Sequence, residues 1–162
     1  MRVVDVKADN VLEWAREKME KKRLPLPKRP RGKDPEFIFP DDPDTLSSSE
    51  LGQLMMRMTA FFGYAQRLFG LADSEFALVD IEYKVQINMA GIEVREKLGR
   101  VSADVVEAAV LSENEDIAPL YERRLKLMTI RSQLESRLKI YEKLYQALSR
   151  ELSRREMESR VS

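Results

Sequence analysis

The side chains best suited to binding chemistry are the cations of a proline-rich stretch near the start of the chain. From Arg16 to Lys33, nine residues are basic and two acidic, a net charge of +7. Positive charge on an extended segment binds nucleic-acid phosphates by counterion release, without reading base sequence. The same stretch could instead be a solvated tether, and the sequence leaves both interpretations open. The candidate phosphate-binding residues are Lys21, Lys22, Arg23, Lys28, Arg29, Arg31 and Lys33.

A second basic group, Arg95, Lys97 and Arg100, surrounds Gly99. These residues would complement the negative dipole of a helix that ends at this glycine. They are also the only basic cluster in residues 34–118, where the net charge is −11. Because a formally neutral chain can still carry a basic face, we include them as candidate nucleic-acid contacts.

The sequence contains few of the residues and motifs that enzymes use for catalysis. The chain has no histidine and no cysteine, which excludes zinc–thiolate sites and cysteine nucleophiles and removes the commonest general base. No phosphate-binding loop, dinucleotide-binding motif or nucleophile elbow occurs. Asp41, Asp42 and Asp44 could hold a divalent cation, but acidic residues just before a helix are favoured by the helix dipole anyway. We expect no enzymatic activity, no cofactor and no metal site.

These charges must be positioned by helices, of which the strongest is predicted from Leu46 to Leu98. Ser47 and Glu50 have the spacing of a capping box, and Leu46 and Leu51 that of a hydrophobic staple. Apolar residues then recur at steps of three and four, the pattern of a helix that buries one narrow stripe. The stripe comprises Leu51, Met55, Met58, Phe62, Ala65, Phe69, Ala72, Phe76, Val79 and Tyr83. Its phenylalanines could stack on bases, but their heptad spacing favours a core role.

Weaker patterns predict three further helical segments. Asn10–Lys22 is a short helix capped by Asp9 or Asn10, and Ser102 caps a short connector. A second long helix is predicted from a capping box at Ser112 and Glu115 to about Glu158. Its apolar stripe is Leu120, Leu127, Leu134, Tyr141 and Leu148, with a second series of Leu138, Tyr145 and Leu152.

The fold class expected is all-α: two long antiparallel helices joined by a short helical connector and preceded by a Pro-rich basic arm. The domain boundaries expected are 1–45 for the short helix and arm, and 46–162 for the helical hairpin. Apolar residues beyond the two stripes exceed what two helices can cover, so we expect coiled-coil-like packing into a homo-oligomer. Arg124 and Arg131 interrupt the second series, as a specificity device between subunits or as a sign that the seam faces solvent there. The candidate interface residues are Phe62, Phe69, Phe76, Tyr83, Arg124, Arg131, Leu138 and Tyr145.

The arm has an apolar end and the chain has no membrane-spanning run. Phe37, Ile38 and Phe39 could dock on a helix or form a peptide hook for a partner protein. Nowhere do eighteen apolar residues run together, and no signal peptide is evident. We expect a soluble cytoplasmic protein without membrane contact.

Three stretches resemble a known family. The first, DIEYKVQINMAGIEVREKLGR, is similar to a long helix that ends in a basic, glycine-containing turn. The second, EAAVLSENEDIAPLYERRLKL, is similar to the connector after that helix, and the third, QLESRLKIYEKLYQALSRELSRRE, is similar to the closing helix. The family with these elements is that of the phage recombination mediators typified by UvsY. The resemblance spans about residues 51–156. This chain departs from it at the turn, where Glu93 and Glu96 lie among the basic residues.

The resemblance implies a ring-forming helical protein that binds single-stranded DNA, displaces single-strand-binding protein and helps load a recombinase. It places DNA contact on Arg95, Lys97 and Arg100, and the basic arm, which lies outside the resemblance, could supply additional charge. For a phage protein the compartment would be the host cytoplasm. Two other classes stay open: a structural or scaffolding helical oligomer of a phage without a nucleic-acid role, and an adaptor that recruits a protein through its arm.

Overall fold

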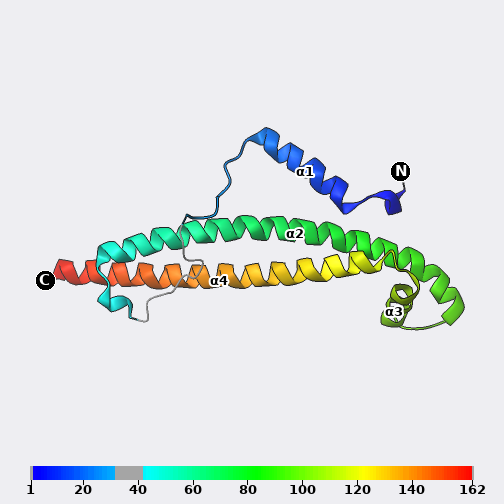
Figure 1. Ribbon diagram of the computed structural model, residues 1–162. Coiled ribbons are helices and arrows are strands. Elements are labelled where there is room, and N and C mark those ends of the chain that lie inside the picture. The colour runs from blue at the N-terminus through cyan, green and yellow to red at the C-terminus, as the bar shows by residue number, and fades with distance from the viewer. Residues whose placement is uncertain (1, 32–41, 162) are drawn as a thin grey trace. The chain divides into compact units, whose positions relative to one another are not determined.

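The computed structural model describes residues 2–31 and 42–161, and every regular element among them is a helix. Figure 1 follows these elements from α1 to α4. The predicted all-α class is therefore confirmed, with two long helices and a short one between them. Their bounds are η1 Val3–Asp5, α1 Ala8–Lys22, η2 Pro43–Thr45, α2 Ser48–Leu98, α3 Ala103–Glu113 and α4 Ala118–Val161.

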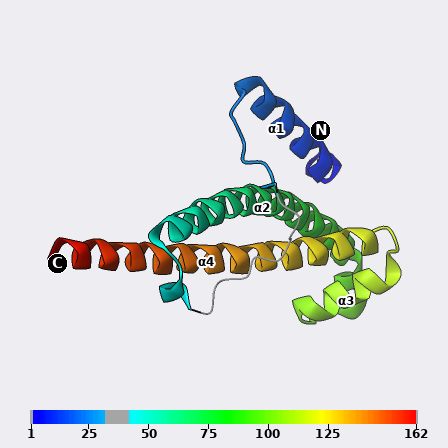
Figure 2. The ribbon, with the colours of Figure 1, turned by 60° about the vertical axis from the view of Figure 1, so that its left-hand side comes forward.

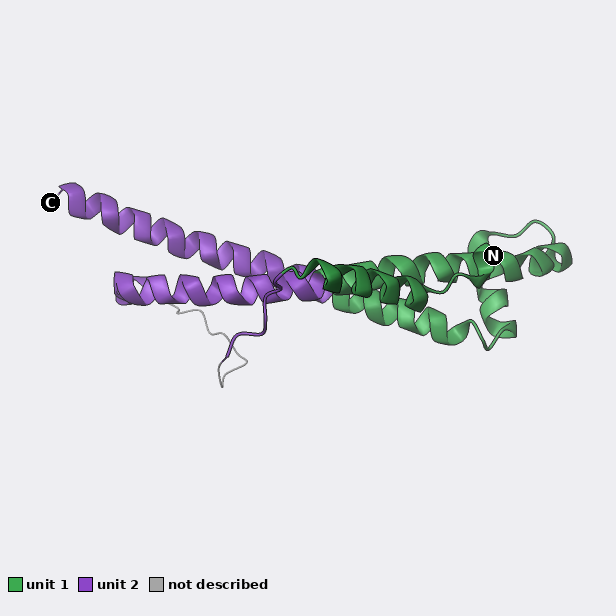
Figure 3. Ribbon diagram, turned by 90° about the horizontal axis from the view of Figure 1, so that it is seen from above, with its two compact units in different colours: residues 1–24, 70–132 green, residues 25–69, 133–162 purple. Residues whose placement is uncertain are grey.

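The chain divides into two compact units, coloured separately in Figure 3. Unit 1 contains residues 1–24 and 70–132, and unit 2 contains residues 25–69 and 133–162. Both α2 and α4 contribute to each unit, so the units do not follow the sequence boundary at residue 45.

The predicted start of α2 is confirmed by its capping box. The Glu50 amide donates to Ser47 Oγ (3.2 Å), and the Ser47 amide donates to Glu50 Oε2 (2.7 Å). These bonds satisfy backbone donors that a helix start leaves unpaired, and they lower the pKa of Glu50. The predicted stripe is also confirmed, because six of its members are buried and the other four are partly buried. The buried six are Leu51, Met58, Ala65, Ala72, Val79 and Tyr83.

In unit 1, α3 and the first turns of α4 pack on the last turns of α2, an arrangement visible in Figures 1 and 2. One core cluster contains Tyr83 and Val94 of α2, Val106 and Val110 of α3, and Ile117 just before α4. Ser102 caps α3 as predicted, since its Oγ accepts from the Val105 amide (3.4 Å). The connector is thus a packed helix that completes the core of this unit.

A second cluster in unit 1 joins α1 to the long helices. Ala8 of α1 is buried with Val79 of α2 and Leu127 of α4. Ion pairs run antiparallel along the same helices, from Asp73 to Arg131 and from Asp80 to Arg124. Within this unit the predicted antiparallel pairing of the long helices is therefore observed.

In unit 2 the first half of α2 packs on the second half of α4. Leu51, Met58 and Leu148 are fully buried together. The rings of Phe61 and Tyr141 stack with centroids 6.3 Å apart. Several apolar residues outside the predicted stripes are thus covered within one chain.

Two predicted helix starts are wrong, for the same physical reason. Helix α1 begins at Ala8, before the predicted cap at Asp9 or Asn10, because Glu82 of α2 accepts the Ala8 amide (2.8 Å). Helix α4 begins at Ala118, and Ser112 lies inside α3, where its Oγ donates to the Ala109 carbonyl (2.8 Å). In both places tertiary packing overrides the local capping signal.

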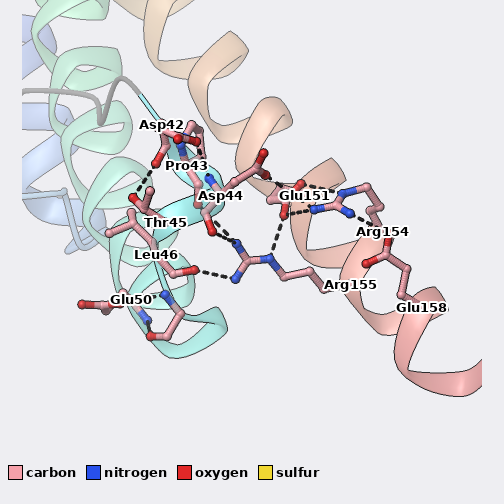
Figure 4. A network of polar contacts seen from close by, with 11 residues as sticks. Asp42, Pro43, Asp44, Thr45, Leu46, Glu50, Glu151, Arg154, Arg155 and Glu158 are labelled. Atoms are coloured by element: carbon pink, nitrogen blue, oxygen red, sulfur yellow. Dashed lines mark hydrogen bonds and ion pairs between the residues drawn. The ribbon is translucent and has the colours of Figure 1, made fainter. Parts of the chain in front are cut away.

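The entry into α2 is held on α4 by Arg155 and, through Asp44 (3.5 Å), by Arg154, as Figure 4 shows. Arg155 donates to the carbonyls of Leu46 (2.6 Å), Pro43 (3.2 Å) and Asp44 (3.4 Å). Its Nε donates to Glu151 Oε1 (2.7 Å), and Arg154 donates to both oxygens of the same carboxylate. These hydrogen bonds lower the pKa of Glu151 to about 2. Glu151 therefore orients the guanidinium groups that hold residues 43–46.

Two glycines of α2 provide a matched test of the unit 1 packing. A Cβ at Gly91 would lie 2.9 Å from Val106 Cγ1 of α3, whereas a Cβ at Gly70 would meet nothing within 4 Å. Alanine favours helix over glycine by about 1 kcal/mol, and overpacking costs about 1–3 kcal/mol. We expect Gly91→Ala to lower the free energy of unfolding by about 1 kcal/mol and Gly70→Ala to raise it by about as much. Denaturant titrations measure both, and stabilisation by both substitutions would contradict the α2–α3 contact.

Acid should loosen the contact between residues 43–46 and α4 in unit 2. The pKa of Glu151 is depressed from 4.5 to about 2 in the folded chain, so its stabilisation is complete above pH 4.5 and is lost as the pH falls toward 2. We expect amide exchange of Thr45 and Leu46, corrected for the intrinsic rate, to accelerate over this window. In Glu151→Gln that acceleration should be absent, while a variant identical to the parent would show that another group is responsible.

Candidate nucleic-acid interface

The predicted basic residues of the arm begin at the end of α1. Lys21 and Lys22 form its last turn, where they complement the helix dipole, and Arg23 caps it in the left-handed conformation, with φ of 49°. Lys28, Arg29 and Arg31 follow in a segment without regular secondary structure. All six side chains are exposed, and Lys33 lies outside the described residues, as do Phe37, Ile38 and Phe39.

The second predicted group lies at the end of α2. Arg95 and Lys97 are in its last turn, and Arg100 follows Gly99, whose φ of 73° makes it the predicted helix stop. All three side chains are exposed. Lys21–Arg23 and this group belong to unit 1, whereas Lys28, Arg29 and Arg31 belong to unit 2.

None of these nine described cations forms an ion pair with another described residue. Arginines of α4 behave differently. Arg123 contacts both Asp9 and Glu75 at 2.7 Å, which raises its pKa and lowers that of Asp9. Arg154 and Arg155 share Glu151. The described cations are thus of two kinds: some form ion pairs with carboxylates, and others are exposed without such a pair. The described members of both predicted basic groups are exposed cations without an ion pair to a described residue.

Arg124 and Arg131, the two predicted interface arginines, each form an ion pair within one chain. Arg124 pairs with Asp80 (2.6 Å) and lies over the Tyr83 ring, 5.2 Å from its centroid. Arg131 pairs with Asp73 (2.5 Å) and lies 5.3 Å from the centroid of Phe76. Each of these charges therefore has a carboxylate partner within the chain, and their role in a subunit interface stays a prediction.

Burial shapes the acid–base properties around Arg124. It opposes ionisation of Asp80, but hydrogen bonds from Lys84 and Arg124 outweigh it and lower the Asp80 pKa. Burial, together with a hydrogen bond donated to Glu107 of α3, raises the pKa of Tyr83. Tyr83 is only 3% exposed, so it serves as core within this chain.

The other predicted interface residues retain more exposure. Phe62, Phe69 and Leu138 are partly buried, and Tyr145 is exposed. Both long helices also carry exposed apolar residues that the interface prediction did not include. Among these are Met56, Leu71, Ile81, Met89 and Ile92 of α2, and Ile130 and Ile140 of α4.

Helix α1 is anchored to the rest of unit 1 by its first turn. Glu82 accepts the Ala8 amide and also pairs with Lys7 (3.1 Å), and Asp9 pairs with Arg123. Negative charge at a helix start satisfies free amides and complements the dipole. The Glu82 anchor could not be found from sequence, because it joins residues 74 positions apart.

The basic end of α1 includes an aromatic side chain that was not predicted as a site residue. Trp14 is 59% exposed, and Lys18 Nζ lies 5.9 Å from the centroid of its ring. The sequence signal for this pair is their i, i+4 spacing on a helix.

Other kinds of site are not evident in the part of the chain that the structure describes. No group of three or more carboxylates is placed to hold a metal ion, and Asp42 instead accepts the Asp44 amide (3.1 Å) as a cap of η2. None of the described helices is long and apolar enough to cross a membrane.

Comparison with known proteins gives no family assignment: no family model, curated protein or solved structure matches the chain.

Removing the anchor should loosen the start of α1 without unfolding the long helices. A helix cap contributes about 1 kcal/mol, so Glu82→Ala should accelerate amide exchange of Val11 to Ala15 by about fivefold. Glu93→Ala is the control, because Glu93 is an exposed carboxylate of the same helix that forms no ion pair with a described residue. Equal exchange in the two variants would show that α1 is held by other contacts.

Proposed function

We propose that this protein is a non-enzymatic recombination mediator that binds single-stranded DNA as a homo-oligomer. The observation that carries the proposal is the set of nine exposed cations without an ion pair among the described residues. The family resemblance supplies the biological setting: displacement of single-strand-binding protein and loading of a recombinase, in the cytoplasm of a phage host.

Charge distribution favours phosphate over protein carboxylates as the ligand of these cations. From Lys21 to Arg31 six residues are basic and none is acidic, and after Arg23 three prolines favour an extended backbone. An extended basic segment can follow a flexible single strand and contact several phosphates in succession. Since such contacts are individually weak, several subunits acting together would raise the affinity through multivalency.

Exposed apolar side chains on both long helices support the oligomer. Met56 is 76% exposed, and Leu71 and Ile81 are each 59% exposed. Packing against a second copy, in coiled-coil fashion, would remove such surface from water at about 25 cal/mol per Å². A closed ring of subunits is the assembly that the resemblance implies.

The same apolar side chains support one alternative, a structural or scaffolding helical oligomer of a phage with no nucleic-acid role. In that case the arm and the end of α2 would only keep the particle in solution. The two functions differ in a single observable, which is affinity for nucleic acid at moderate salt.

We expect tight, salt-sensitive binding of a labelled single-stranded oligonucleotide, measured by fluorescence anisotropy on protein whose mass is known from light scattering. The logarithm of the association constant should fall linearly with the logarithm of salt concentration, by about 0.7 per phosphate contact. An assembled particle that ignores DNA at low salt would refute the mediator function and leave the scaffold.

Variants that remove charge test which basic group contacts the DNA. Replacing Lys28, Arg29 and Arg31 by glutamine, or Arg95, Lys97 and Arg100 by glutamine, should weaken binding and reduce the salt slope by about 2. A matched control replaces Lys126, Lys139 and Lys143 of α4, which changes net charge equally; Lys126 and Lys139 pair with neighbouring glutamates. Mass should be unchanged throughout, and equal losses in control and test variants would point to net charge alone.

A further inference from the structure

We propose that Trp14 is a base-stacking residue, which makes the basic end of α1 select unpaired over paired nucleic acid. This inference rests on the proposed function and deepens it. Phosphate contacts alone do not distinguish a single strand from a duplex of similar charge. A planar ring can distinguish them, because the faces of unpaired bases are accessible and those of a duplex are stacked.

The sides of α1 differ in what they present. Ala8 is buried, and Val11, Leu12 and Ala15 are partly buried on the side of the helix that they share with it. Trp14 lies off that docked side and is 59% exposed. Burying an indole is strongly favourable, so its exposure on a helix that has an apolar docking side indicates a role other than core packing.

Most of the charged helix neighbours of Trp14 are cations, and one exposed carboxylate, Glu17 at i+3, also borders it. Lys18 and Lys21 follow it at i+4 and i+7, so the three share one face, and Lys22 borders it. All three lysines are exposed, and Lys18 Nζ is 5.9 Å from the indole centroid. An aromatic face bordered by ammonium groups matches a nucleotide, whose base is flat and whose phosphate is negative.

A membrane surface is a weaker match to this face. A helix lying in a lipid interface buries a broad apolar stripe beside its basic residues. Here Val11, Leu12 and Ala15 are partly buried on the docked side, and the two exposed apolar side chains of α1, Trp14 and Met19, lie about 140° apart around the helix and form no broad stripe. The arrangement favours a ligand that contacts one ring and several charges at once.

The chain contains a single tryptophan, so its fluorescence reports this site alone. We expect oligothymidylate to quench the emission of the full-length protein in parallel with the rise in anisotropy, and a duplex of equal length to quench it far less. Anisotropy showing salt-sensitive binding without quenching would overturn the stacking role while leaving the proposed function intact. Absence of any binding at low salt would overturn both.

Substitutions separate stacking from bulk and charge. Trp14→Leu should weaken oligothymidylate binding about tenfold or more, leave duplex binding unchanged and leave the salt slope unchanged, because no charge is removed. Trp14→Phe should retain part of the affinity. Equal affinity of Trp14→Leu and the parent protein for oligothymidylate would contradict the proposal.

Two controls test whether Trp14 instead contacts a second subunit or a membrane. Light scattering should give the same mass for Trp14→Leu and the parent, and a smaller particle would place Trp14 in a subunit interface instead. Vesicles of phosphatidylglycerol should not shift the emission to the blue, and a blue shift with vesicles together with no quenching by oligothymidylate would assign the face to a membrane.

Discussion

Burial of one narrow apolar stripe of α2 against α4 is the interaction on which the rest of the structure depends. In unit 1 the stripe meets α4 at Val79 and Leu127, and in unit 2 at Met58 and Leu148. Each turn of such a helix pair buries only one or two side chains, so other segments of the chain must add to the core. In unit 1 the connector α3 adds Val106 and Val110 to the core, and in unit 2 Arg155 holds the entry into α2.

Because the stripe is narrow, both helices carry many charged residues outside it. The pairing of these charges distinguishes cations that stabilise the fold from cations that could bind a ligand. Carboxylates of α2 pair with arginines of α4 at Asp73, Asp80 and Glu75, next to the apolar contact. Pairs of this kind help to set the register between the helices. The cations of the arm and of the end of α2 have no such neighbours among the described residues, which is why a phosphate ligand is the simplest explanation of their clustering.

The docked first turn of α1 gives the basic face a fixed origin. Glu82 and Arg123 hold Lys7, Ala8 and Asp9, so the helix that carries Trp14 and the lysines starts at a defined place in unit 1. A binding residue on an anchored helix loses less conformational freedom when it meets its ligand than one on a free chain does. This physical argument links the anchor, which has no chemistry of its own, to the proposed single-strand site.

The sequence by itself determined what depends on neighbouring residues: the all-α class, the Ser47–Glu50 capping box, the heptad stripe of α2 and the stop at Gly99. These follow from 3.6-residue periodicity and from side chains that bond to backbone within a few positions. Only the tertiary structure decided what depends on residues far apart in the chain. It started α1 at Ala8 because Glu82 accepts its amide, placed Ser112 inside α3, and paired Arg124 and Arg131 with carboxylates of α2. It also separated Trp14 from the docked side of α1, since helical spacing sets which residues share a face, but only packing decides which face is covered.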